Sequence, residues 1–126
     1  MRLLLDTHVF LWALAGSREL KAPARRLIES ADEVHVSAAS IWEIAIKSRL
    51  GKIDADPIEV AAAIDAAGFV ELPVRAAHAM GVANLPAHHA DPFDRILIAQ
   101  AIAEPLRLVT ADTVLARYSE LVILIR

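Results

Sequence analysis

Short apolar runs alternate along the chain with longer segments of helical periodicity. Residues 2–5 (RLLL) are too few for a helix and end at Asp6, which predicts a buried strand. Similar apolar runs predict further strands at 34–36, 69–72, 108–109 and 121–125. Helical spacing, with Gly, Ser and Asp-Pro pairs at the boundaries, predicts helices at 7–14, 22–30, 39–49, 57–67, 75–82, 92–103 and 113–118, with a loop over 84–90.

The order of these elements predicts the fold class. Strands alternate with helices, and the strands are continuously apolar. This pattern is typical of an α/β fold whose mainly parallel sheet is covered by helices on both faces. The 126 residues contain no linker, repeat or low-complexity segment, so we expect a single domain over residues 1–126.

Composition and charge exclude several classes of protein. The absence of cysteine excludes disulfides, thiolate zinc sites and a cysteine nucleophile. No apolar run reaches about 18 residues, and Asp6 interrupts the N-terminal run, so we expect a cytoplasmic protein with no membrane span and no signal peptide. The net charge of −3 gives no overall attraction to nucleic acid, which would have to bind through local basic patches.

Acidic residues interrupt the apolar segments at several points. Asp6 and Asp112 each follow a predicted strand, so both are expected at the carboxyl edge of the sheet, where ligands of such folds bind. Glu43 lies within the otherwise apolar helical segment SIWEIAIK, and Asp91 and Asp94 open the helix DPFDRILIAQA. A carboxylate beside a core is costly unless a helix cap, a cationic side chain or a metal ion pairs with it.

Helix capping is the alternative explanation for each acid taken singly. Ser40 and Glu43 match a capping box, although a helix start at Ser37 would place Glu43 beyond the first turn. Asp91 is the stronger cap, because a proline follows it at the first helical position. Asp94 fits both a first-turn acid favoured by the helix dipole and a catalytic acid.

Capping explains each acid without requiring the acids to lie close together. Their positions at one edge of the sheet would instead bring them together. Converging carboxylates repel one another, and their pKa values rise. Mg²⁺ or Mn²⁺ removes this difficulty, because either ion takes oxygen ligands and leaves open positions for phosphate oxygens. We therefore predict that Asp6 is tolerated beside the core because it helps to hold a cation.

Four segments, in this order, resemble the PIN-domain ribonucleases and, more narrowly, the VapC-type toxins of bacterial toxin–antitoxin pairs. They are LLLDTHVFLWAL, SAASIWEIAIKSRLGKI, HHADPFDRILIAQA and LVTAD, and the resemblance covers nearly the whole chain. It implies a three-layer α/β/α sandwich with a five-stranded, mainly parallel sheet and a central first strand. It also implies a Mg²⁺- or Mn²⁺-dependent endoribonuclease that is inhibited by a cognate antitoxin and is usually a homodimer.

The resemblance also implies roles for individual residues. It places the catalytic and metal-binding acids of the family on Asp6, Glu43, Asp94 and Asp112. Among these, Asp6 and Asp94 would be the principal metal ligands, while the acid at Asp112 varies most across the wider family. Three further residues are expected to support the acids, with capping or local turn hydroxyls as the alternative: Thr7, Asp91 and Thr110.

Other residues are candidates for binding RNA or a protein partner. The basic residues near the acids are RNA-contact candidates, with a solvated helix face as the alternative: Lys47, Arg49, Lys52 and Arg95. Because HExxH spacing is absent, no histidine is assigned to the metal, and His88 and His89 are expected to be loop residues that could meet an RNA phosphate. Trp12 and Trp42 indicate either burial within one subunit or an apolar groove covered by an antitoxin segment, which could also place an Arg or Lys at the acids.

Two other functions are alternatives to the nuclease. A haloacid-dehalogenase-type phosphohydrolase also begins with a strand ending in Asp, but it needs a second acid two residues later, where this chain has His8. The chain also lacks a glycine-rich phosphate loop. A degenerate, non-catalytic PIN-like module that binds RNA or protein is disfavoured because all four acids are present.

Overall fold

The computed structural model describes residues 1–89 and 91–126, so the predicted loop over 84–90 includes one position outside the described residues. Within these residues, five parallel strands form a sheet in the order β3-β2-β1-β4-β5. The strands are β1 (Arg2–Leu5), β2 (Glu33–Ser37), β3 (Val70–Leu72), β4 (Arg107–Thr110) and β5 (Val122–Leu124). The helices are α1 (Thr7–Ala15), α2 (Ala22–Ser30), α3 (Ala38–Arg49), α4 (Pro57–Ala66), α5 (Ala76–Gly81) and α6 (Pro92–Ala103).

The central position of β1 determines where its carboxyl end lies. Leu5 pairs with Val36 of β2 on one side and with Val109 of β4 on the other. The segments that follow β1, β2 and β4 therefore leave the sheet side by side. The predicted α/β architecture, with a parallel five-stranded sheet and a central first strand, is confirmed.

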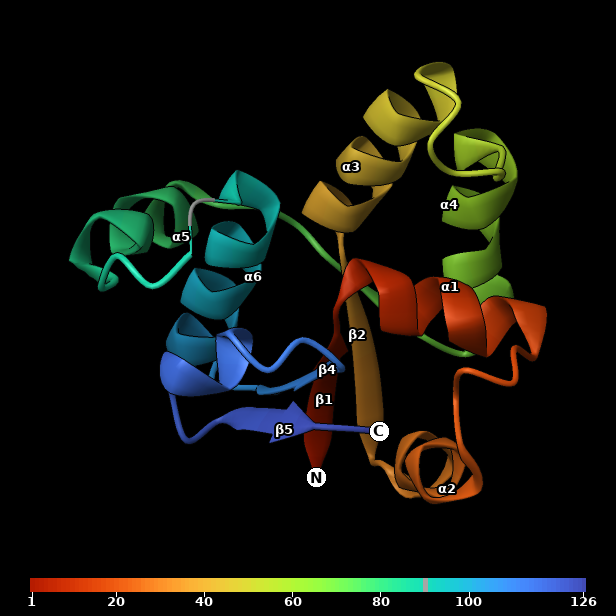
Figure 1. Ribbon diagram of the computed structural model, residues 1–126, viewed down its shortest axis with the longest axis horizontal. Coiled ribbons are helices and arrows are strands. Elements are labelled where there is room, and N and C mark those ends of the chain that lie inside the picture. Colours follow the sequence, from red (N-terminus) through yellow and green to blue (C-terminus); the bar gives the residue numbers. More distant parts are fainter. Residues whose placement is uncertain (90) are drawn as a thin grey trace.

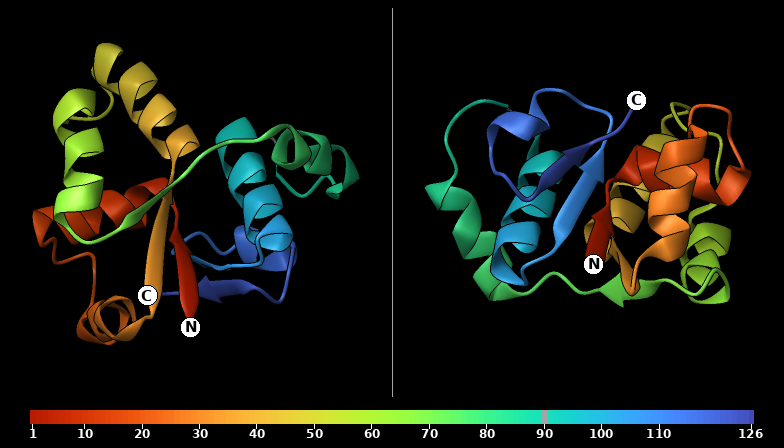
Figure 2. Two further views of the ribbon diagram at one scale, coloured as in Figure 1. Left: turned by 180° about the vertical axis from the view of Figure 1, so that it is seen from behind. Right: turned by 90° about the horizontal axis from the view of Figure 1, so that it is seen from below.

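Helices cover both faces of the sheet because β1 directs alternate leucines to opposite faces. Leu3 and Leu5 are buried in a cluster that includes side chains of α1, α2, α3 and α4. Leu4 is buried in a second cluster formed mainly by α6. Figure 1 shows α1, α2 and α4 on one side of β1 and β2 and α5 and α6 on the other, and the views in Figure 2 show the same layers. Three layers result, with the apolar strands shielded on both faces.

Six of the seven predicted helices agree with the structure to within a residue at each end. The segment 75–82 forms α5 and then continues as the 3₁₀ turn η1 (Val82–Asn84). The short helix predicted at 113–118 is present only as the 3₁₀ helix η2 (Leu115–Arg117). So short a segment offers too few hydrogen bonds to offset helix nucleation. Among the described residues, no helix is long and apolar enough to cross a membrane.

Candidate active site

The acidic residues singled out in the sequence lie together at the carboxyl edge of the sheet. They line one pocket, to which the ends of β1 and β4, the second turn of α3 and the start of α6 all contribute. The residues that line it are Asp6, Thr7, His8, Glu43, Lys47, His89, Asp91, Asp94 and Asp112. The structure thus brings together all four acids of the predicted site.

Asp6 is held in a fixed orientation at the end of β1. Its Oδ1 accepts a hydrogen bond from the Val9 amide at 2.8 Å, which caps α1, and its Oδ2 accepts one from the Thr110 hydroxyl at 2.5 Å. Thr110 Oγ1 in turn accepts a hydrogen bond from the Asp112 amide at 3.0 Å. Burial raises the pKa of Asp6, although these two hydrogen bonds to its carboxylate lower it in part. The expected hydrogen bond between Thr110 and an acid is present.

Glu43 points into the pocket from α3 and is only 3% exposed. Its Oε1 accepts a hydrogen bond from Thr7 Oγ1 at 2.7 Å, and its Oε2 lies 2.5 Å from Lys47 Nζ, one helical turn further along. Glu43 does not cap α3, because Ser37 is the N-cap residue and accepts a hydrogen bond from the Ala39 amide. The capping box considered for this acid is therefore wrong.

Asp91 and Asp94 have different surroundings although both begin α6. Asp91 Oδ1 accepts hydrogen bonds from the amides of Phe93 at 2.8 Å and Asp94 at 3.2 Å, so the predicted cap is present. Among the described residues, no backbone amide donates to the Asp94 carboxylate, which lines the pocket. Burial, followed by the negative charge of Asp91, raises the pKa of Asp94 to about 6.

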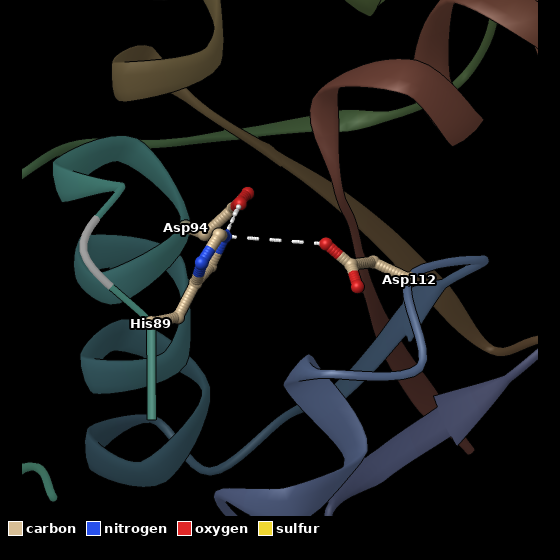
Figure 3. Close-up of side chains that lie close together, drawn as sticks. All are labelled: His89, Asp94 and Asp112. Carbon is tan, nitrogen blue, oxygen red and sulfur yellow. Dashed lines mark hydrogen bonds and ion pairs between the residues drawn. The ribbon is translucent and has the colours of Figure 1, made fainter. Parts of the chain in front are cut away.

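His89 joins this cluster, although no histidine was predicted there. Its Nε2 lies 2.8 Å from Asp94 Oδ2 and 4.0 Å from Asp112 Oδ2 (Figure 3). The imidazole therefore lies between an acid at the start of α6 and one that follows β4. Ligand spacing in the sequence did not reveal this site, because its members come from separate segments. The only sequence signal was a pair of histidines shortly before the Asp-Pro start of α6.

The four basic residues proposed to contact RNA occupy three different settings. Lys47 lies within the acidic pocket, where the Glu43 carboxylate, and more weakly the charges of Asp91 and Asp94, raise its pKa. Arg49 and Lys52, by contrast, are exposed at and beyond the end of α3.

Arg95 points away from the acids into the loop that precedes α6. Its guanidinium donates to the carbonyls of Pro86 at 2.9 Å and His89 at 3.3 Å, among others, and also contacts the Tyr118 hydroxyl. These contacts occupy the guanidinium in holding the loop. The structure therefore shows Arg95 holding the loop, and its contact with RNA stays a prediction.

Known proteins are similar to this chain in sequence and in fold. The sequence profile of the PIN domain matches residues 3–121. The chain belongs to the PIN-domain family. Among curated proteins, Ribonuclease VapC22 of Mycobacterium tuberculosis (strain ATCC 25618 / H37Rv) is 35% identical over 115 residues, which cover 86% of this chain and 85% of that protein. The resemblance to VapC-type PIN-domain proteins is confirmed.

Solved structures share the fold of this PIN domain. VapBC2 from Rickettsia felis, bound to a DNA fragment from their promoter, matches with a TM-score of 0.69 and 17% identity over 98% of this chain and 97% of that one. A toxin–antitoxin complex from Klebsiella pneumoniae matches with a TM-score of 0.65 and 19% identity, over 95% of this chain and 94% of that one.

The donor chemistry of this PIN domain fits a divalent cation. The pocket concentrates carboxylate oxygens, which are the ligands preferred by Mg²⁺ and Mn²⁺. The Lys47 ammonium already lies among these acids as a cationic partner of Glu43. Three side chains of the pocket offer ligand atoms that all lie within 4.8 Å of one another: His89, Asp94 and Asp112.

Replacing Asp94 by Asn should stabilise the metal-free protein at neutral pH. The folded-state pKa of about 6 lies above the ordinary value of 3.8, so the stability contributed by protonated Asp94 is present below about pH 4 and is lost as the pH rises through 6. We expect the free energy of unfolding of Asp94→Asn to exceed that of the wild type by on the order of 2 to 3 kcal/mol at pH 7.5, because one pKa unit is worth about 1.4 kcal/mol. At pH 4 the difference should be small. Thermal unfolding in chelator across this pH range measures the difference.

Asp56→Asn is the matched control for this experiment. Asp56 is an acid outside the pocket: it caps α4, where its Oδ1 accepts a hydrogen bond from the Ile58 amide. The stability of Asp56→Asn relative to the wild type should not rise between pH 4 and pH 7.5. A loss of stability in Asp94→Asn at both pH values would contradict the account and would mean that the ionised carboxylate stabilises α6.

Proposed function

We propose that the chain is a metal-dependent endoribonuclease that acts as the cytoplasmic toxin of a toxin–antitoxin pair. The observation that carries this proposal is the convergence of four buried or partly buried acids in one pocket: Asp6, Glu43, Asp94 and Asp112. A curated relative named as a ribonuclease and the toxin–antitoxin complexes that share the fold support it.

In this proposal the acids hold Mg²⁺ or Mn²⁺, with Asp6 and Asp94 as the main ligands and Glu43 and Asp112 contributing directly or through water. The bound ion would activate a water and stabilise the charge that develops on the phosphate. Thr110 orients Asp6 through a hydrogen bond, and Thr7 orients Glu43 in the same way. The chain thus supplies two carboxylates whose orientations are fixed by hydrogen bonds within the pocket.

The RNA backbone is proposed to run along the end of α3. Lys47 lies in the pocket, while Arg49 and Lys52 are exposed further along the same segment. This local group of cations offsets the overall charge of −3, which would otherwise repel a polyanion. A non-catalytic PIN-like module is the alternative function, and the complete, oriented set of acids favours the enzyme.

Replacing Asp6 by Asn should abolish most RNA cleavage while leaving the fold intact. Asparagine keeps the size of the side chain and can still accept the hydrogen bond from the Val9 amide, but it removes the charge that holds the cation. Thr110→Val should have a smaller effect, a loss of about 10–100-fold, as is usual when the group that orients a metal ligand is removed. Cleavage of total RNA by the purified chain, with and without Mg²⁺ or Mn²⁺, measures both losses.

Asp56→Asn serves as the control here as well, because it removes an acid outside the pocket. This variant should cleave RNA at the wild-type rate. Cleavage by Asp6→Asn at the wild-type rate would show that the site is misassigned. Loss of RNA binding in Arg49→Ala and Lys52→Ala, without any cleavage by the wild type, would favour the non-catalytic alternative.

An apolar groove beside the acids is proposed as the place where a segment of the antitoxin binds. Trp42 on α3 is 63% exposed and packs edge-on against Phe93 of α6, with ring centroids 5.1 Å apart. Both residues line this groove, which borders Asp91 and Asp94 along α6. Trp12, in contrast, is partly buried against the main core cluster, so the expected groove includes only one of the two tryptophans.

Fluorescence of a Trp12→Phe variant, in which Trp42 is the only tryptophan, tests the groove. Trp42 should be quenched by iodide in the isolated chain, and the product of the neighbouring antitoxin gene should shift its emission to the blue and protect it. Exposed aromatic side chains of this kind are common anchors of interfaces. An accompanying fall in metal affinity is expected if the partner also places an Arg or Lys at the acids.

Sedimentation of the isolated chain separates this proposal from self-association. If Trp42 is already protected in the chain alone, and dilution to the monomer exposes it, then a second copy covers the groove and the antitoxin assignment is wrong. The homodimer implied by the family resemblance remains a prediction that the same sedimentation experiment tests.

A further inference from the structure

We infer that His89 is a metal ligand, so that the site combines one imidazole nitrogen with carboxylate oxygens and discriminates in favour of Mn²⁺ over Mg²⁺. This inference rests on the proposed metal-dependent function and adds a residue outside the four acids. It follows from the geometry around His89, from the way that its backbone is held, and from the distribution of charge in the pocket.

The distances around His89 are those of groups that can share one ion. Two ligands at about 2.1 Å from an octahedral ion lie about 3 Å apart when adjacent and about 4.2 Å apart when opposite. His89 Nε2 is 2.8 Å from Asp94 Oδ2 and 4.0 Å from Asp112 Oδ2 (Figure 3). An ion between the three side chains therefore requires only small changes in their positions.

The backbone of His89 is anchored by groups outside the pocket. Its carbonyl accepts hydrogen bonds from Arg95 Nη1 at 3.3 Å and from the Tyr118 hydroxyl at 3.2 Å. Arg95 also binds the carbonyls of Val82 and Pro86, so one guanidinium fixes several turns of the preceding loop. These contacts hold the backbone that carries the imidazole in place beside Asp94.

The ion pairs in the pocket favour an ion beside His89. Lys47 already supplies a cationic partner to Glu43, at 2.5 Å. Among the described residues, the ion-pair partner of Asp94 and Asp112 is His89. A divalent ion bound by His89 together with Asp94 and Asp112 would therefore place its charge beside two carboxylates that have no Lys or Arg ion-pair partner in the described part of the chain.

A nitrogen ligand changes which ions the site prefers. Mg²⁺ binds oxygen ligands almost exclusively, whereas transition ions accept imidazole readily. Of the two ions proposed for the enzyme, Mn²⁺ should therefore gain more from His89. If His89 is a ligand, removal of its imidazole should reduce the preference for Mn²⁺. If His89 only supports the structure, its removal should weaken the binding of both ions to the same extent.

Isothermal titration of the full chain with Mn²⁺ and with Mg²⁺ gives the ratio of the two affinities directly. We expect His89→Ala to bind Mn²⁺ about 10-fold or more weakly, which is the lower range for groups that support a metal site, and to change Mg²⁺ binding much less. His89→Gln, which retains a hydrogen-bonding side chain, should show the same loss of preference. His88→Ala is the matched control, because the adjacent imidazole packs edge-on against Tyr118, with ring centroids 5.1 Å apart.

Three results would contradict the inference in distinguishable ways. An unchanged Mn²⁺ affinity in both His89 variants, or an equal loss for the two ions, overturns the assignment of His89 and leaves the acidic site standing if Asp94→Asn still loses binding. A loss of preference in His88→Ala equal to that in the His89 variants also overturns it. Failure of the wild-type chain to bind either ion overturns the inference together with the proposed function.

Discussion

The repulsion among carboxylates gathered at one edge of a parallel sheet is the constraint on which the rest of this site depends. Asp6 and Glu43 are almost fully buried, and Asp94 is partly buried within the same pocket. Burial and mutual repulsion both disfavour the ionised carboxylates, and the raised pKa values of Asp6 and Asp94 express that cost. Without a cation, the local arrangement opposes the stability of the fold that creates it.

The surrounding structure compensates for this cost in specific ways. The carboxylate of Asp6 receives a hydroxyl and an amide hydrogen bond, and Glu43 receives the Thr7 hydroxyl and the Lys47 ammonium. Asp94 has the least support, since its partner is the His89 imidazole. The fold makes these contacts possible because the parallel strands β1 and β4 end side by side, which brings the residues after them together.

Much of this arrangement could be predicted from local sequence signals. Continuous apolar runs predict the buried parallel strands, and the proline after Asp91 predicts the cap that the structure contains. Asp6 and Asp112 could be placed at the same edge because both follow strands. The helix start at Ser37 separates Glu43 from the first turn and so removes its capping role.

The remainder depends on contacts between segments far apart in the chain. Nothing local distinguishes His88 from His89, yet the fold turns one toward Tyr118 and the other toward Asp94. Arg95 follows Asp94 directly in the sequence, but successive helical residues point in different directions, and Arg95 binds loop carbonyls. Trp12 and Trp42 look alike in the sequence and differ because α3, unlike α1, borders the groove.

The central claim is that this PIN domain tolerates its converging acids because they hold a divalent cation. The most direct test is the melting temperature of the wild type in chelator and in millimolar Mg²⁺ or Mn²⁺, compared with the double variant Asp6→Asn/Asp94→Asn. A ligand that binds only the folded state stabilises it, so the cation should raise the melting temperature of the wild type, and the gain should vanish in the double variant. A wild-type melting temperature that does not respond to either ion, or an equal response in the double variant, would contradict the account.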